Sequence, residues 1–228
     1  MWLVRPMHVT ARFRLLAWAA LVFGRRGILS RNRRSSSMST RLPGFKGEYL
    51  WELDIAEKQV LALAEAFPAE RYGWRPAETA RSVSEVLVHI GAGGRSLLAL
   101  LGVDASQDLY GKLEGEGLAK VWAMFKRNES LGKSITDKAE VLALLRKSLD
   151  GIRTAFTEAS DTELDRPEMF GGESTSARRL YMRALCHLHE HMGQLIAYAR
   201  AMGLPAPWQG EWEAQRKAIE EKLAASKK

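Results

Sequence analysis

The chain has 228 residues, of which 46% are hydrophobic, and a formal net charge of +7. This length supports one substantial core and argues against a second full domain. The positive charge does not indicate a nucleic-acid-binding face, because residues 1–46 carry ten of the 34 bases and none of the 27 acids. The remaining 24 bases and 27 acids give the rest of the chain a net charge of −3. The single cysteine, Cys186, excludes an intramolecular disulfide framework and fits a reducing compartment.

Residues 1–46 are predicted to be a basic tail outside the fold. The apolar segment Leu15 to Gly24 is too short to span a membrane, which takes about 20 residues. It can be the apolar part of a signal peptide, although Arg25 and Arg26 follow it directly and no small-residue cleavage site appears. A transit peptide, or translation that begins at Met38, explains the composition as well. We therefore expect a cytoplasmic protein, or an exported one if residues 1–37 act as a signal peptide.

Helical periodicity dominates from Gly47 onward. A first amphipathic helix is predicted from there to the FPAERYGWRP segment, whose two prolines end the run. A second helix is predicted to begin after Ser82, because SVSE has the form of a capping box, and to end at Gly102. Residues 103–134 are rich in glycine and charge, with one amphipathic piece around LAKVWAMF that favours a short helix.

Two further long helices complete the pattern. Periodic apolar residues predict one over 137–159 and another over 175–202, the latter ended by Gly203 and Pro205. Residues 209–228 read as a short charged terminal helix, and no strand or tight hairpin is predicted. The fold class is therefore all-α, an antiparallel four-helix bundle over 47–208 with one long crossover connection. Such bundles place metal and ligand sites between facing helices.

The histidines of the last long helix indicate a metal site. His187 and His191 are four residues apart, so their rings lie on the same face of a helix. His189 is rotated by about 200° from His187, so it should lie at the surface or contact a ligand histidine from outside the cluster. The best third ligand is His89, and the glycines at 91, 93 and 94 thin that helix wall and leave room for a cavity above a metal.

Three imidazoles with an open position can hold a divalent ion that activates a water or a thiol. Imidazole ligands suit Zn, Ni, Fe or Cu, and the spacing alone does not choose among these metals. The competing interpretation is that each histidine is a hydrogen-bonded core or surface residue. Cys186 lies beside the histidines, but a lone cysteine on an apolar helix face is usually a packing residue.

Two stretches resemble the signature regions of the DinB/YfiT-like superfamily of four-helix-bundle proteins. They are YGWRPAETARSVSEVLVHIGAG (72–93) and HLHEHMGQLIAYARAMGLPAPW (187–208). The resemblance implies one metal ion bound at His89, His187 and His191, and frequent homodimers. Members of the superfamily include thiol S-transferases that use bacillithiol or mycothiol, a thiol-dependent maleylpyruvate isomerase and suspected hydrolases, so the resemblance implies an activity of this kind.

Three more positions are candidates for the pocket or for support of the ligands. Trp74 can wall the pocket or simply pack. Glu190 and Gln194 can each accept a hydrogen bond from a ligating imidazole, or lie in solvent. The function predicted from the sequence is a metal-dependent transferase that activates a low-molecular-weight thiol or water toward a small-molecule electrophile. No nucleic acid and no membrane span are expected. The alternatives are a non-catalytic metal-binding or stress-response protein and a metal-dependent hydrolase.

Overall fold

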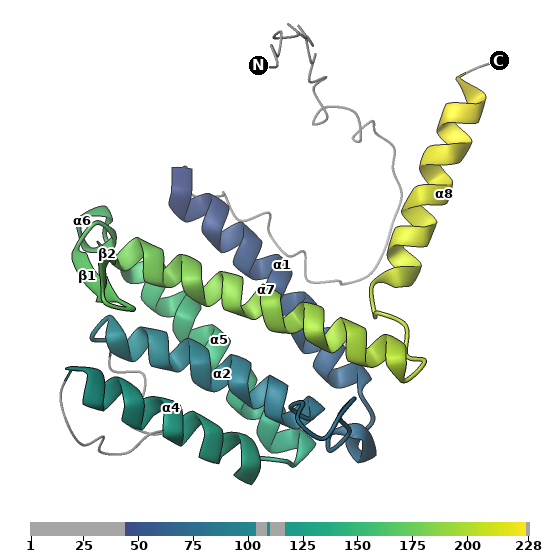
Figure 1. The fold of residues 1–228 in the computed structure, drawn as a ribbon. Helices are drawn as coiled ribbons and strands as arrows, with labels where there is room; N and C mark the ends of the chain where they lie inside the picture. Colours follow the sequence, from purple (N-terminus) through teal and green to yellow (C-terminus); the bar gives the residue numbers. More distant parts are fainter. Residues whose placement is uncertain (1–43, 104–108, 110–116, 227–228) are drawn as a thin grey trace, which may run out of the picture. The chain divides into compact units, whose positions relative to one another are not determined.

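The computed structural model describes residues 44–103, 109 and 117–226 (Figure 1). Most of the basic tail predicted over 1–46, including Leu15 to Gly24, lies outside the described residues. The helices and strands occur in this order: α1 (Gly44–Ala66), the 3-10 turn η1 (Ala69–Arg71), α2 (Val83–Leu100), α4 (Gly117–Ser134), α5 (Lys138–Glu158), α6 (Asp161–Leu164), β1 (Pro167–Phe170), β2 (Glu173–Ser176), α7 (Ala177–Ala201) and α8 (Gln209–Ala225).

Helices α1, α2, α5 and α7 form the bundle. α2 packs against α5 and α7 and, on its other side, against α4, while α1 packs against α5 and α7 (Figure 1). The all-α bundle predicted from the sequence is therefore confirmed. The connection between α2 and α5 is the long one, and it contains α4, an 18-residue helix rather than the short piece that the sequence favoured.

The starts of two bundle helices follow from local chemistry. Ser82 caps α2: its Oγ accepts from the Glu85 amide at 3.3 Å, and the Glu85 carboxylate accepts from the Ser82 amide at 2.7 Å. This is the capping box that the sequence predicts. Asp137 caps α5 by accepting from the amides of Ala139 and Glu140. These caps fix where the two helices enter the bundle.

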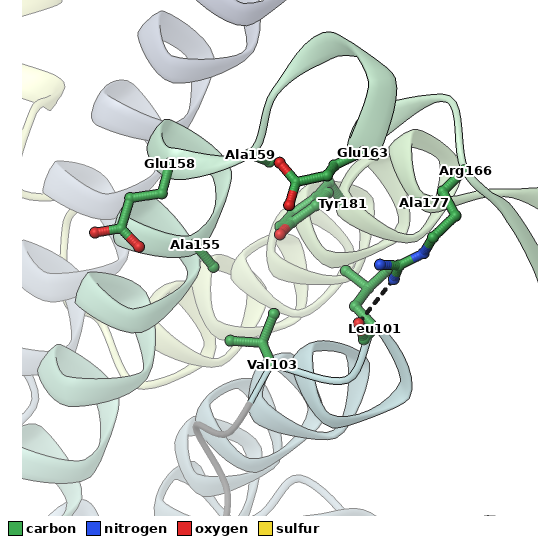
Figure 2. Close-up of a pocket in the computed structure, with 9 residues that line it drawn as sticks. All are labelled: Leu101, Val103, Ala155, Glu158, Ala159, Glu163, Arg166, Ala177 and Tyr181. Atoms are coloured by element: carbon green, nitrogen blue, oxygen red, sulfur yellow. Dashed lines mark hydrogen bonds between the residues drawn. The ribbon is translucent and has the colours of Figure 1, made fainter.

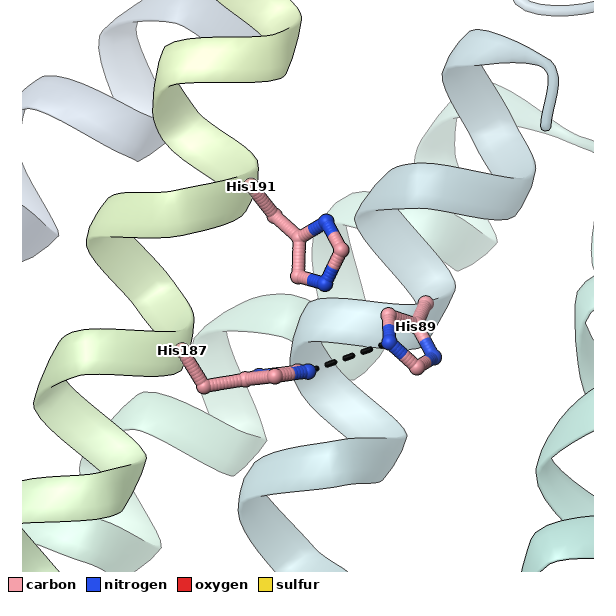
Figure 3. A group of neighbouring side chains, drawn as sticks. All are labelled: His89, His187 and His191. Carbon is pink, nitrogen blue, oxygen red and sulfur yellow. Dashed lines mark hydrogen bonds between the residues drawn. The ribbon is translucent and has the colours of Figure 1, made fainter. Parts of the chain in front are cut away.

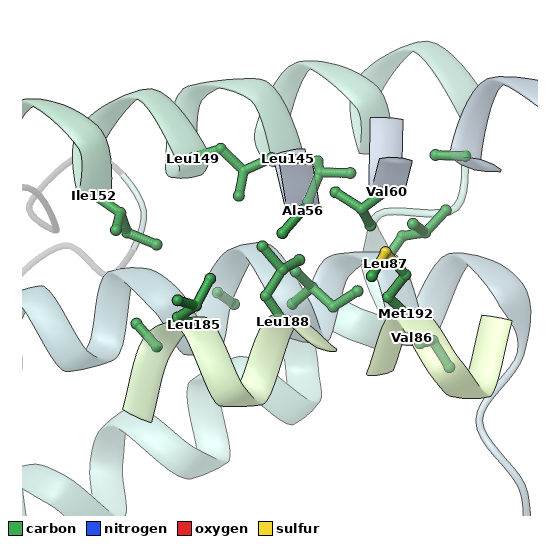
Figure 4. Close-up of a cluster of buried hydrophobic side chains, with 14 of the residues drawn as sticks. Ala56, Val60, Val86, Leu87, Leu145, Leu149, Ile152, Leu185, Leu188 and Met192 are labelled. Atoms are coloured by element: carbon green, nitrogen blue, oxygen red, sulfur yellow. The ribbon is translucent and has the colours of Figure 1, made fainter. Parts of the chain in front are cut away.

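The core lies among the four bundle helices. Figure 4 shows Leu145, Leu149 and Ile152 of α5 facing Leu185 and Leu188 of α7. All five side chains are buried, and each leucine that leaves water on folding contributes about 1.5–3 kcal/mol. Length and apolar composition alone would let α2 cross a membrane, but 61% of this helix is buried inside the protein, which is the setting of a core helix.

The expectation that the chain contains no strand or hairpin is wrong. β1 and β2 pair antiparallel, with Pro167 opposite Ser176 and Phe170 opposite Glu173. The two residues between them, Gly171 and Gly172, have φ values of +63° and +87°, a combination that glycine adopts without strain. Because β2 runs to residue 176, α7 begins at Ala177 and not at residue 175.

The terminal helix predicted for 209–228 is present as α8. None of its residues is buried, and Trp212, Ile219 and Leu223 are among the exposed large hydrophobic side chains of the described chain. Nothing in α8 contributes to the core or to the candidate site.

Candidate metal centre

The structure brings the three predicted histidines together. His89 lies on α2, and His187 and His191 lie on successive turns of α7 (Figure 3). The Nε2 atoms of His89 and His187 are 3.0 Å apart, and the ring centroids of the three pairs are separated by 4.8, 4.6 and 4.6 Å. One ring nitrogen from each residue falls within 4.8 Å of the other two. The four-residue spacing thus places the His187 and His191 rings side by side, as the sequence predicts, and α2 supplies the third imidazole, that of His89.

These nitrogens fit a divalent ion. Zn–N bonds of about 2.0–2.1 Å in a tetrahedral site place two ligand nitrogens about 3.3 Å apart, which the observed cluster approaches before any ion is added. All three side chains are half-buried. Within the described part of the chain, the group able to hold a metal consists of these three histidines, with no carboxylate or thiol among them. A bound ion would therefore keep a position for an exogenous ligand.

The surroundings keep two of the rings neutral. The pKa of His89 is lowered to about 3, mainly because burial disfavours the charged ring, with smaller effects from Arg81 and the other two histidines. Burial is also the main reason that the pKa of His187 is lowered to about 4, and His191 and Arg183 add to it. A neutral imidazole has a free lone pair, so both residues are in the metal-binding form at pH 7.

The glycines of α2 make room for neighbouring side chains. A Cβ at Gly93 would lie 2.7 Å from Cε1 of His187, so the imidazole occupies the space that a side chain would take. A Cβ at Gly94 would lie 2.7 Å from Cδ1 of Ile152, and one at Gly91 would meet Leu144 at 3.4 Å. α2 therefore approaches α7 through Gly93 and α5 through Gly91 and Gly94.

Of the two candidates for supporting a ligand histidine, the structure places Gln194 in contact. Its Oε1 lies 2.9 Å from Nδ1 of His191. Glu190 instead forms an ion pair with Arg183, both of whose terminal nitrogens donate to the carboxylate. Trp74 packs edge-on against Tyr198, with ring centroids 5.4 Å apart, so the packing interpretation describes it better than a pocket wall.

The remaining sequence candidates lie outside the cluster. His189 points away from it and sits 3.3 Å from the carboxylate of Glu52, which agrees with the predicted surface position. Cys186 is exposed and is not part of the group that can hold a metal.

Two residues near the site were not anticipated. Tyr198 donates to the backbone carbonyl of Arg81 at 3.1 Å and accepts from Gln194 at 2.8 Å. The four-residue step from Gln194 to Tyr198 along one helix face is a signal for their contact. The sequence contains no comparable signal for Arg81, because this residue comes near the site only when the helices pack together.

A separate cavity of about 190 Å³ lies near the C-terminal ends of α2 and α5 (Figure 2). Leu101, Glu163, Arg166 and Tyr181 are among its lining residues, and Arg166 donates to the Leu101 carbonyl at 2.8 Å. None of the three clustered histidines lines this cavity.

The fold and the cluster define a helical-bundle protein with a three-histidine group that can hold a metal ion. Residues 52–195 match the model of the DinB superfamily, and the chain belongs to this family. All three histidines fall within the matched range.

Two solved structures are similar to this chain, and the first shares its fold. A DinB-like protein from Bacillus cereus is 20% identical with a TM-score of 0.53, over 72% of this chain and 95% of that one. A DinB-like protein from Bacillus subtilis is also 20% identical, with a TM-score of 0.42, over 68% of this chain and 92% of that one. A comparison with curated proteins gave no match.

Proposed function

We propose that the chain is a metal-dependent transferase that joins a low-molecular-weight thiol to a small electrophile. His89, His187 and His191 hold one divalent ion, Zn, Ni or Fe. The observation that carries the proposal is a three-nitrogen cluster that includes no fourth protein ligand among the described residues. When bound, the ion would lower the pKa of a thiol, or of water, at the position left open.

The chain's own residues prepare the site for this chemistry. Burial keeps His89 and His187 neutral, so protons compete weakly with the ion at these two rings. The exposed side chain of Arg81 contributes positive charge that is felt at both rings. Positive charge beside the cluster suits a thiol that carries anionic groups.

The reaction balances without a redox partner. The thiol proton passes to solvent, the sulfur attacks an electrophilic carbon, and the new S–C bond replaces the bond to the leaving group. A thiol needs no protein base once its pKa is lowered, whereas hydrolysis by water requires further proton transfers. In the described chain the metal-holding group contains no carboxylate, and the nearby Glu190 carboxylate is paired with Arg183. The thiol reaction is therefore favoured over the hydrolase alternative.

Metal content tests the first half of the proposal. Elemental mass spectrometry on the full chain should find close to one ion per chain, and both His89→Ala and His191→Ala should lose it. His189→Ala is the matched control: it removes an imidazole from the same helix without touching the cluster, so its metal content should stay unchanged. A wild-type protein that is folded yet stays metal-free after incubation with Zn²⁺, Ni²⁺ and Fe²⁺ would overturn the proposal.

Activity tests the second half. We expect metal-loaded protein to conjugate a chromogenic aryl halide with bacillithiol, mycothiol, glutathione or coenzyme A, and the chelated protein and His191→Ala to lack this activity. Metal binding without conjugation of any of these thiols would favour the non-catalytic alternative, in which the ion stabilises the bundle. The homodimer and the cytoplasmic location expected from the sequence stay predictions.

A further inference from the structure

A chain of three hydrogen bonds leads from His191 to the loop that precedes α2. The Nδ1 atom of His191 lies 2.9 Å from Oε1 of Gln194, Gln194 Nε2 donates to the Tyr198 hydroxyl at 2.8 Å, and this hydroxyl donates to the Arg81 carbonyl at 3.1 Å. We call this chain the His191 relay. It joins the helix that carries two of the histidines to the residue before the N-cap of the helix that carries the third.

The far end of the relay fixes the direction of every bond in it. The Arg81 carbonyl can only accept a hydrogen bond, so the Tyr198 hydroxyl must donate its one proton to this carbonyl. Tyr198 therefore accepts from Gln194, which requires that the amide NH₂ face Tyr198 and that Oε1 face His191. With the amide reversed, Tyr198 would need two protons to satisfy both contacts. Only one orientation of Gln194 satisfies all three bonds.

This direction also determines which nitrogen of His191 carries the proton. Because Oε1 of Gln194 accepts, Nδ1 of His191 must be the N–H, and the lone pair of the neutral ring lies on Nε2. Nε2 is the nitrogen that faces His89 and His187 in Figure 3. The relay thus selects the tautomer whose lone pair points into the cluster.

We propose that Gln194 and Tyr198 are positioning residues that hold His191 as the Nδ1–H tautomer and aim its Nε2 at the metal. This inference rests on the metal site of the proposed function, and it adds the device that orients one ligand. Tyr198 is itself well placed for the role, since it is only 6% exposed and its ring packs edge-on against Trp74. An outer partner of this kind raises metal affinity by about 10- to 100-fold in other sites.

The experiment uses the full chain and three substitutions. Gln194→Ala removes the acceptor, Gln194→Glu keeps an acceptor for Nδ1–H, and Tyr198→Phe removes the hydroxyl while keeping the ring on Trp74. Glu190→Ala is the matched control on the same helix, because Glu190 pairs with Arg183 and not with a histidine. Circular dichroism melts establish that each variant is folded.

Two readouts separate positioning from a merely structural role. Long-range ¹H–¹⁵N spectra of the metal-free protein at pH 8 report the His191 tautomer directly. We expect Nδ1–H in the wild type, in Gln194→Glu and in Glu190→Ala, and a shift toward Nε2–H in Gln194→Ala. Competition with a chelator for Zn²⁺ should give a dissociation constant about 10- to 100-fold higher for Gln194→Ala, with Tyr198→Phe in between and Gln194→Glu near the wild type.

Either of two results would overturn the inference: an Nε2–H tautomer in the wild type, or a Gln194→Ala variant with unchanged tautomer and unchanged affinity for Zn²⁺. The tautomer is measured without metal, so this measurement tests the His191 relay even if the wild-type chain binds no Zn²⁺. In that case the proposed function fails, and the failure is distinct from that of the relay.

Discussion

At Gly93, adding a single methyl group should weaken metal binding without lowering the stability of the fold. It lies in the interior of α2, where replacing glycine by alanine ordinarily stabilises a helix by about 0.5–1 kcal/mol. Here the new Cβ would lie 2.7 Å from Cε1 and 3.3 Å from both ring nitrogens of His187. The backbone of α2 need not move, because the imidazole is the flexible partner in this contact.

The size of the ring's displacement follows from the contact distance. Ordinary contact begins at 3.4 Å, so the His187 ring must withdraw by about 0.7 Å from the position that a Cβ at Gly93 would crowd. A metal site tolerates deviations of about 0.2 Å in its ligand distances. The displacement exceeds this tolerance several-fold, and we expect Gly93→Ala to weaken Zn²⁺ binding at least as much as loss of an outer hydrogen-bond partner does, by about 10- to 100-fold.

The assay pairs Zn²⁺ competition with thermal melting of the metal-free protein. Gly93→Ala should keep or raise the melting temperature while losing affinity. Gly193→Ala is the matched control, since it is also a helix interior position but a Cβ there would meet nothing within 4 Å. If Gly93→Ala binds Zn²⁺ as tightly as Gly193→Ala and the wild type, the ring position inferred for the metal-bound state is wrong.

Three further predictions concern stability. The lowered pKa values of His89 and His187 mean that the metal-free fold is fully stabilised above about pH 6.5 and loses stability as the pH falls toward 4. Because pH 5 lies about 1.5 units below the ordinary histidine pKa of 6.5, full coupling would cost ~2 kcal/mol per ring. Both rings are partly exposed, so we expect about half of that loss, about 1 kcal/mol per ring. Urea midpoints at pH 8 and pH 5 in chelator check this, and a His89→Gln variant that keeps the full pH dependence would contradict it. Leu149→Ala, at a side chain 1% exposed, should lower the free energy of unfolding by about 2–5 kcal/mol in urea titrations; a loss below 1 kcal/mol would show that the site refills. Gly172→Ala, at φ +87°, should cost about 1–2 kcal/mol in the same titration, whereas an unchanged midpoint would show that the hairpin turn relaxes freely.

Local sequence signals predicted much of the bundle and part of the site. The capping box at Ser82 and the apolar periodicity located α2 and α5, because both signals depend only on residues within one helix. The pairing of His187 with His191 was predictable for the same reason: four residues make about one helical turn. Their convergence with His89 came from the resemblance and from helix faces, and the structure shows the three nitrogens together.

What the sequence did not predict depends on contacts between elements. The hairpin was missed because its strands have only four residues each and carry no apolar alternation, so the Gly171–Gly172 pair was its one signal. The side chain that packs against Gly93 was not predicted, for a similar reason. A glycine in a helix signals a close approach, but only the packing of α7 on α2 shows that the group approaching is the His187 imidazole.

The packing of α2 against α7 and α5 also positions the three histidines. Gly93 and Gly94 are adjacent, so their missing side chains face directions about 100° apart, and α2 fits closely against α7 on one side and α5 on the other. Beside the ligands, Leu188 and Met192 of α7 are buried in the same core. Forming the bundle therefore brings the three nitrogens within 4.8 Å before an ion arrives. Little reorganisation remains when the ion binds, and the free energy of coordination can go into affinity rather than into assembling the ligands.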